Sequence, residues 1–155
     1  IRGMAAALRK AVDHMDENMA RAAALRDKLI AGVLQIPACR LNGDAERRLP
    51  GNANFCFAGV EGESLLLLLD MKGIYASAGS ACTAGSLEPS HVLLALGLPK
   101  AAAQGSLRLT LDEVNTEEEV DYVLEQLPCI IRHLREMNPT WEELVRRGEA
   151  APYTD

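Results

Sequence analysis

The first 36 residues carry apolar side chains at the spacing of a single long amphipathic helix. Apolar residues recur every three or four positions from Met4 to Val33, and Pro37 ends the pattern. About 30 helical residues at ~1.5 Å each extend ~45 Å, whereas a compact domain of this length is roughly 40 Å across. Such a helix overhangs its own domain. We therefore expect residues 1–36 to form a long helix that connects two parts of a larger protein.

Shorter elements follow this helix, and strands are interspersed with helices among them. Alternating side chains predict strands in "ANFCFAGV" and "GSLRLTLD", with two shorter ones in "CRLNGD" and "IYAS". Helical spacing predicts helices in "EGESLLLLLDMKG", "EPSHVLLALGL" and "NTEEEVDYVLEQLPCIIRHLREM". This order predicts an α+β fold over residues 37–138, a two-layer small domain with a small, mostly antiparallel sheet packed on helices. Residues 139–155 are expected to form a tail with a short helix and a loose end.

Composition limits what such a domain binds. With 155 residues, 48% of them hydrophobic, the chain is long enough for one domain with a core. A formal charge of −6 argues against nucleic acid as a direct partner, because phosphate contacts need clustered Lys and Arg. No apolar run reaches the ~20 residues of a membrane helix, and no signal peptide is recognisable. The four cysteines lack the spacing of a zinc site or a disulfide framework, which favours a reduced, cytoplasmic compartment.

Cys82 lies in a stretch of small and polar residues, "SAGSACTAGSLEPSH". Buried, inert packing is the ordinary interpretation of a cysteine, and we expect it for Cys39, Cys56 and Cys129. The neighbours of Cys82 offer little apolar surface to bury it, and the glycines beside it permit unusual backbone angles. Such a loop is either a flexible surface connection or a carrier that moves a reactive sulfur between two places. The residues alone leave both open.

Arg108 and Asn54 are the other candidate site residues. Arg108 occupies the polar face of a strand of alternating leucines. A solvated arginine is the ordinary explanation, and a guanidinium that binds both oxygens of a carboxylate is the alternative. Asn54 follows a Pro-Gly loop, where a role in the turn is the default. His91 and the other two histidines are expected at the surface, and no carboxylate is spaced to form a metal site with them.

Several stretches of the chain resemble the cysteine desulfurases that supply sulfur for iron–sulfur clusters. The block "GSACTAGSLEPSHVL" is highly specific, and "LNGD", "NFCFAGVEGESLLLLL", "GSLRLTL" and "NTEEEVDYVLEQL" match the same family in the same order. The resemblance covers nearly the whole chain. It implies the small domain of a fold-type I pyridoxal phosphate enzyme.

The resemblance also implies a chemistry and a role for each candidate residue. Enzymes of this family use pyridoxal phosphate to take sulfur from L-cysteine, and they release L-alanine. Cys82 then matches the nucleophile that carries the sulfur as a persulfide, Arg108 the residue that grips the substrate carboxylate, and Asn54 a residue next to the active site. The implied partners are an iron–sulfur scaffold or another sulfur acceptor, with Cys82 as a transient ligand of a 2Fe–2S cluster. A homodimer is implied for the full-length protein, and a tail after Asn138 that contacts the scaffold.

The chain departs from the family in one important respect. The family holds its cofactor through a lysine preceded by histidine in a large domain, and none of Lys10, Lys28, Lys72 and Lys100 has that context. We therefore expect this chain to be the small C-terminal domain of such an enzyme, without activity on its own. The alternatives are a stand-alone persulfide relay, a lyase or transaminase relative, and a platform for dimer or partner contacts.

Overall fold

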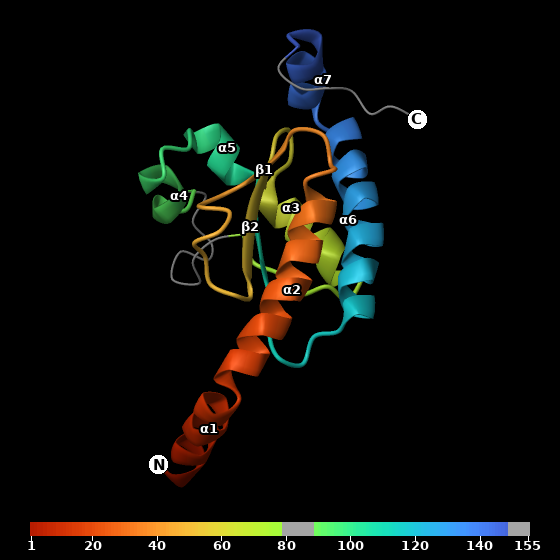
Figure 1. Ribbon diagram of the computed structural model, residues 1–155. Helices are drawn as coiled ribbons and strands as arrows, with labels where there is room; N and C mark the ends of the chain where they lie inside the picture. Colours follow the sequence, from red (N-terminus) through yellow and green to blue (C-terminus); the bar gives the residue numbers. More distant parts are fainter. Residues whose placement is uncertain (79–88, 149–155) are drawn as a thin grey trace.

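A three-stranded antiparallel sheet is the centre of the computed structural model, which describes residues 1–78 and 89–148 (Figure 1). Strands β1 (Cys39–Leu41), β2 (Asn52–Phe57) and β3 (Ser106–Thr110) lie in chain order, so β2 is the central strand. The segment "IYAS" is not the strand expected from the sequence. Only Ser77 bridges Arg108, on the outer side of β3.

Helices cover the two faces of the sheet unequally. The described residues form α1 (Arg2–Asp13), α2 (Met15–Val33), α3 (Gly62–Asp70), α4 (His91–Ala95), α5 (Lys100–Gln104), α6 (Glu117–Glu136) and α7 (Pro139–Arg146). Helices α2, α3 and α6 pack on one face of the sheet and against each other, whereas the short α4 and α5 lie on the opposite side (Figure 1). The α+β fold with a mostly antiparallel sheet is confirmed. Helix α5 was not expected from the sequence, because its "KAAAQ" lacks an apolar period.

The main core lies between the sheet and helices α2, α3 and α6. Phe55 of β2 and Leu107 of β3 are completely buried there, together with Leu29, Leu65 and Leu127 from the three helices. Burying a side chain of this size stabilises the fold by about 1.5–3 kcal/mol, so this face fixes the register of the strands.

A smaller cluster lies on the opposite face. Cys56 is buried there against Leu93, Leu98 and Ala103 of the α4–α5 region. This confirms that Cys56 faces away from Phe55 and packs as an apolar residue. The cluster holds α4 over the sheet next to the polar part of that face.

The N-terminal region forms two helices rather than the single one expected. Helix α1 ends at Asp13 and α2 begins at Met15, because His14 leaves helical geometry with φ −113° and ψ 12°. Asp and His are weak helix formers, and the acidic Asp16 favours a new helix start there. Glu113 accepts hydrogen bonds from Lys10 before the break and from Asn18 after it, which ties both helices to the body.

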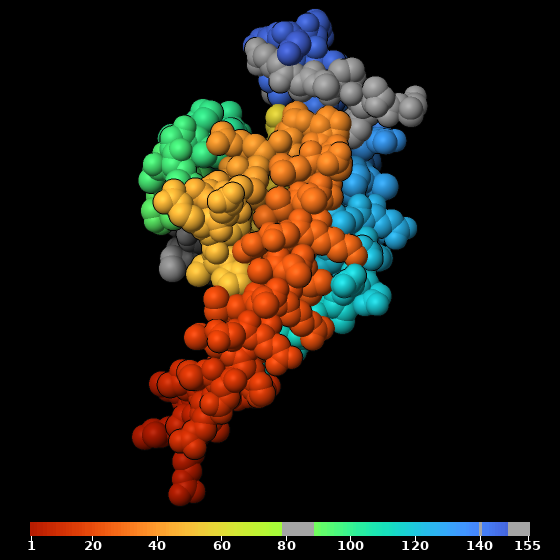
Figure 2. Space-filling model, in the orientation of Figure 1, coloured from red at the N-terminus to blue at the C-terminus, as the bar shows by residue number. Residues whose placement is uncertain are grey.

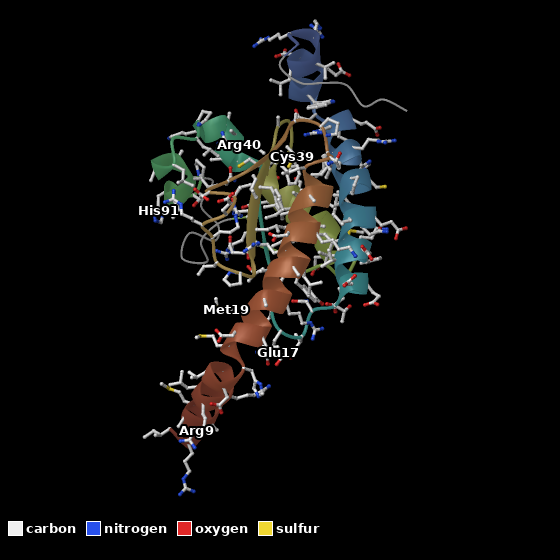
Figure 3. The ribbon with its side chains drawn as sticks, in the orientation of Figure 1. Arg9, Glu17, Met19, Cys39, Arg40 and His91 are labelled. Atoms are coloured by element: carbon white, nitrogen blue, oxygen red, sulfur yellow. The ribbon has the colours of Figure 1, made fainter. Side chains whose placement is uncertain are left out.

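Helix α1 projects from the rest of the molecule as a narrow arm (Figures 1 and 2). None of its residues is buried. Its apolar side chains are spaced three and four positions apart and continue into α2, and Arg9 and Met19 extend into solvent (Figure 3). We call these residues the N-terminal apolar stripe: Met4, Leu8, Val12, Met15 and Met19, which are between 45% and 78% exposed.

At the other end of the molecule, helices α6 and α7 pack around a buried arginine. Helix α6 starts at a capping box in "NTEEE", in which Thr116 and Glu119 hydrogen-bond to each other's backbone N–H groups. Arg135 of α6 is completely buried, donates to the carbonyl of Ala58 at 2.9 Å, and lies 4.0 Å from the centroid of the Trp141 ring. The short helix expected in residues 139–155 is present as α7, with Trp141 buried on it, and residues 149–155 lie outside the described residues.

Candidate substrate-binding site

One row of polar residues crosses the sheet on the face that carries α4. Asn54 of β2 lies directly opposite Arg108 of β3, and Ser77 bridges Arg108 on its other side. Asn42 continues the register of β1, since its backbone N–H donates to the carbonyl of Asn54 at 2.8 Å. Residues in one cross-strand row point to the same face, so the sequence-predicted Asn54 and Arg108 are brought together.

This row forms the floor of a cavity of about 280 Å³. Helix α4 supplies an apolar wall opposite the polar floor. Arg108 is the only charged residue among the described residues of the lining, so the cavity favours an anionic ligand. Its lining consists of Asn42, Gly43, Asn52, Asn54, Ala78, Ser90, Val92, Leu93, Leu96 and Arg108.

The Arg108 side chain is exposed at this cavity. Among the described residues its guanidinium makes no hydrogen bond or ion pair, so all of its donors face the space around it. A guanidinium presents parallel N–H groups that match the two oxygens of a carboxylate. This arrangement distinguishes Arg108 from Arg26 and Arg135, whose donors are used in the structure by Asp27 and by backbone carbonyls.

Asn42 is the site residue that sequence analysis missed. It is only 4% exposed, and its Nδ2 donates to Oδ1 of Asn54 at 2.7 Å and to Sγ of Cys56 at 3.1 Å. Arg48 donates to the carbonyls of Asn42 and Asn52, at 3.0 and 3.3 Å, and so ties the ends of β1 and β2 together. The available signal was the period-two continuation of β1 into "LNGD", which a turn interpretation of Asn-Gly conceals.

Cys82 lies outside the described residues, in segment 79–88. The described residues that flank this segment are at the cavity: Ala78 and Ser90 both line it. Ala78 is held by its carbonyl, which accepts a hydrogen bond from Oγ of Ser106 at 2.5 Å. His91 lies on the outer side of α4, exposed as expected (Figure 3).

The other three cysteines differ from one another. Burial raises the pKa of Cys39 to about 12 and also raises the pKa of Cys56, so both are thiols at neutral pH. Cys129 is exposed on α6, which corrects the expectation that it is buried.

In residues 1–78 and 89–148, no group of His, Cys, Asp and Glu is placed to hold a metal ion. None of the helices described there has the length and apolarity to cross a membrane.

None of the chain's four lysines lines the cavity. Lys10 pairs with Glu113 at 3.1 Å, and Lys28 pairs with Asp121 at 2.7 Å between α2 and α6. Lys72 and Lys100 are exposed at the ends of other elements. The cavity therefore lacks a lysine amine for covalent attachment of an aldehyde cofactor.

Comparison with known proteins identifies the family of this chain. Residues 1–123 match the aminotransferase class-V family. Over 150 residues, the chain is 53% identical to the cysteine desulfurase IscS of Clostridium botulinum strain Hall, covering 95% of this chain and 38% of that protein. It is 46% identical over 140 residues to the cysteine desulfurase NifS of Azotobacter vinelandii, covering 90% of this chain and 35% of that one.

A solved structure shows the same arrangement of elements. A NifS-like protein superimposes with a TM-score of 0.73 and 33% identity, over 84% of this chain and 32% of the other. The chain thus spans little more than a third of the length of the relatives it matches. With the family matched over most of its residues and the fold shared with a solved NifS-like protein, the chain belongs to the aminotransferase class-V family.

Proposed function

We propose that this chain is the C-terminal small domain of a cysteine desulfurase and supplies that enzyme with a carboxylate grip and a sulfur-carrying thiol. The observation that carries the proposal is the Asn54–Arg108 pair on the floor of a cavity that Ala78 and Ser90 also line. Those two residues flank the segment that contains Cys82. The identity to cysteine desulfurases over nearly the whole chain supports the same assignment.

In the proposed reaction the carboxylate of L-cysteine binds the guanidinium of Arg108 through two parallel hydrogen bonds. The thiolate of Cys82 attacks the substrate sulfur, the carbon–sulfur bond breaks, and a sulfur–sulfur bond forms. The carbon takes up a proton, so that L-cysteine and one thiol give L-alanine and one persulfide without any outside oxidant. The persulfide is a reversible state, and an acceptor thiol removes the outer sulfur.

The described residues do not fit the covalent cofactor of this chemistry, since no lysine lines the cavity. Pyridoxal phosphate supplies the electron sink for carbon–sulfur cleavage, and we assign its binding to a larger domain that precedes residue 1 in the complete protein. Residues 1–36 then form the connecting helices, 37–138 the small domain and 139–155 a tail that contacts an acceptor. The N-terminal apolar stripe supports this division, because it has no partner among the described residues.

The proposal extends to the partners of the complete enzyme. It acts as a cytoplasmic homodimer and delivers sulfur to an iron–sulfur scaffold or to another acceptor for thio-modification. During transfer to a scaffold, Cys82 is a transient ligand of the 2Fe–2S cluster under assembly. The free state of Cys39, Cys56 and Cys129 supports a reducing compartment.

The test uses the complete protein, loaded with pyridoxal phosphate and given L-cysteine without reductant. Mass spectrometry of the peptide that contains Cys82 is expected to show one added sulfur, together with released L-alanine. Cys82→Ala should abolish both signals, and Cys129→Ala, a matched change of an exposed cysteine, should retain them. A cofactor-loaded wild-type protein that releases no alanine and adds no sulfur would exclude the proposed function.

A further inference from the structure

We infer that Asn42 is a positioning residue for the carboxylate site, because it sets which end of the Asn54 amide faces the ligand. This inference rests on the proposed function of Arg108 and gives a role to Asn42, which lies in the matched stretch "LNGD" but to which the resemblance assigned no role. The three residues lie in one row across the sheet, with Asn54 between Asn42 and Arg108.

The direction of the hydrogen bond carries the inference. The Nδ2 of Asn42 donates to Oδ1 of Asn54 at 2.7 Å. An asparagine amide is planar, with its oxygen and its NH₂ group on opposite sides, so engaging the oxygen with Asn42 turns the NH₂ group away from it. Because Arg108 lies on the far side of Asn54 in the row, that NH₂ group faces the same space as the guanidinium.

Asn42 is itself held firmly in place. It is 96% buried, its backbone N–H donates to Asn54, and its carbonyl accepts from Arg48 at 3.0 Å. Its second amide proton goes to the sulfur of Cys56 at 3.1 Å. Both amide protons are therefore used within the protein, and they hold the amide in one orientation.

This orientation of the Asn42 amide leaves one buried polar atom without a hydrogen bond, and the positioning role explains why. Oδ1 of Asn42 is buried and, among the described residues, has no hydrogen-bond partner. Native proteins rarely leave a buried polar atom unsatisfied, so each such atom requires an explanation. Leaving this acceptor unpaired keeps the donor end of Asn42 on Asn54, and that in turn keeps a donor from Asn54 on the cavity side.

The result is a site with two neighbouring donors and no acidic side chain in the described lining. One oxygen of the carboxylate accepts a hydrogen bond from the NH₂ group of Asn54. The guanidinium of Arg108 donates to the other oxygen, or to both. If the Asn54 amide turned round, its oxygen would face the carboxylate and repel it. Asn42 therefore determines whether Asn54 attracts or opposes an anionic ligand.

A double-mutant cycle in the complete, cofactor-loaded protein tests this inference. Asn42→Ala, Asn54→Ala and the double variant are compared with wild type for kcat and KM with L-cysteine, and for the Kd of L-alanine by calorimetry. Loss of one hydrogen bond to a charged ligand predicts that Asn42→Ala raises KM and the Kd about 10- to 100-fold, with kcat changed less than about twofold. Because Asn42 acts through Asn54, the double variant should bind no more weakly than Asn54→Ala alone.

Two further variants separate positioning from folding. Asn42→Asp cannot donate to Asn54 and is expected to raise KM more than Asn42→Ala does. Asn138→Ala removes a half-buried asparagine that donates to Gly59 at 3.0 Å outside the cavity lining, so it should lower Tm without changing KM. Asn42→Ala with an unchanged KM, or single-variant effects that multiply in the double variant, would overturn the inference. Failure of the proposed function is distinguishable, because wild type itself would then release no alanine.

Discussion

Two arginines of this molecule have opposite environments: Arg108 is placed to bind a ligand, and Arg135 is placed to stabilise the fold. Arg108 is exposed and its guanidinium makes no hydrogen bond or ion pair to the described residues, whereas Arg135 is fully buried with carbonyl and aromatic partners. A buried cation must be paired because desolvation is costly, and an exposed one on a cavity floor is available to a ligand. Substitutions at the two positions should therefore change different quantities.

At Arg108, substitution is expected to weaken binding and leave stability nearly unchanged. Arg108→Lys keeps the charge but loses the two parallel donors, so KM for L-cysteine should rise about 10- to 100-fold in the complete enzyme. The Tm should stay within about 1 °C, since an exposed side chain away from the core contributes little. Steady-state kinetics with thermal unfolding checks this, and a wild-type KM in Arg108→Lys would contradict the carboxylate role.

At Arg135, substitution is expected to destabilise the fold. Arg135→Met leaves the carbonyl of Ala58 without its donor and removes the contact with Trp141, so unfolding free energy should fall by about 2–4 kcal/mol. Arg146→Met, an exposed change on the neighbouring helix α7, should cost less than about 0.5 kcal/mol. Denaturant unfolding measures both, and equal effects would refute the anchoring role of Arg135.

The half-buried thiol of Cys39 predicts a stability that falls at alkaline pH. Burial raises the pKa of Cys39 from its ordinary 9.0 to about 12, so the folded protein keeps this proton at pH values where the unfolded chain has lost it. The contribution is fully present below pH about 9 and is lost as pH rises toward 12. Unfolding midpoints between pH 8 and 10.5 should decline less in Cys39→Ala than in wild type. Cys129→Ala, at an exposed position, should keep the wild-type slope.

At the scale of elements, the register of β2 and β3 determines the site. Gly105 immediately precedes β3, and a Cβ at this position would lie 2.4 Å from the carbonyl oxygen of Phe57 and 2.8 Å from that of Val60. Both are backbone atoms, which cannot move without shifting β2. The close approach of the two strands, and with it the pairing of Asn54 with Arg108, therefore requires glycine here.

Gly105→Ala is accordingly expected to lower unfolding free energy by about 2–4 kcal/mol. Gly3→Ala is the matched control, because a Cβ there meets no atom within 4 Å and alanine favours the helix α1. Chemical denaturation of both variants provides the comparison. Similar stability in the two would mean that β2 and β3 tolerate a wider separation than their contacts indicate.

Strong periodicity made most elements predictable from the sequence. The alternation around Phe55 and Leu107 gave both long strands, and the acidic start of "NTEEE" located α6. The break at His14 was not predictable, since the apolar period runs through it unchanged and only backbone geometry and the bonds to Glu113 mark it.

The candidate site was predictable only in part. Arg108 stood out as a polar residue on a strand, but Asn42 did not, because its role depends on a hydrogen bond to a residue 12 positions later. The role of the buried Arg135 was equally hard to predict, because its partners Ala58 and Trp141 come from a separate segment and from another helix. Long-range partners of single polar side chains leave no periodic signal in a sequence.

At the scale of the whole molecule, the N-terminal arm presents an exposed apolar surface. Its apolar stripe is exposed over its full length, whereas the opposite end of α2 is buried in the core. An exposed patch of this kind marks an interaction surface. In the division proposed above, the preceding domain covers it.

Leu8→Lys in the complete protein is therefore expected to lower Tm by several degrees, because it places a charge in a buried contact. Arg9→Lys, beside it but off the stripe, should have no effect. Thermal unfolding of the two variants tests the division of domains. An unchanged Tm in Leu8→Lys would mean that the preceding domain leaves the arm exposed.

The two faces of β3 also bear on how this site can tolerate mutation. Leu107 and Leu109 lie in the core, and Arg108 between them lies on the cavity floor. A slip of one residue would bury the guanidinium and expose two leucines, at a loss that no marginally stable domain survives. A chain with the wrong register of β3 therefore does not fold, and no folded enzyme with a displaced guanidinium accumulates. Every molecule that folds presents Arg108 to its ligand in the same place.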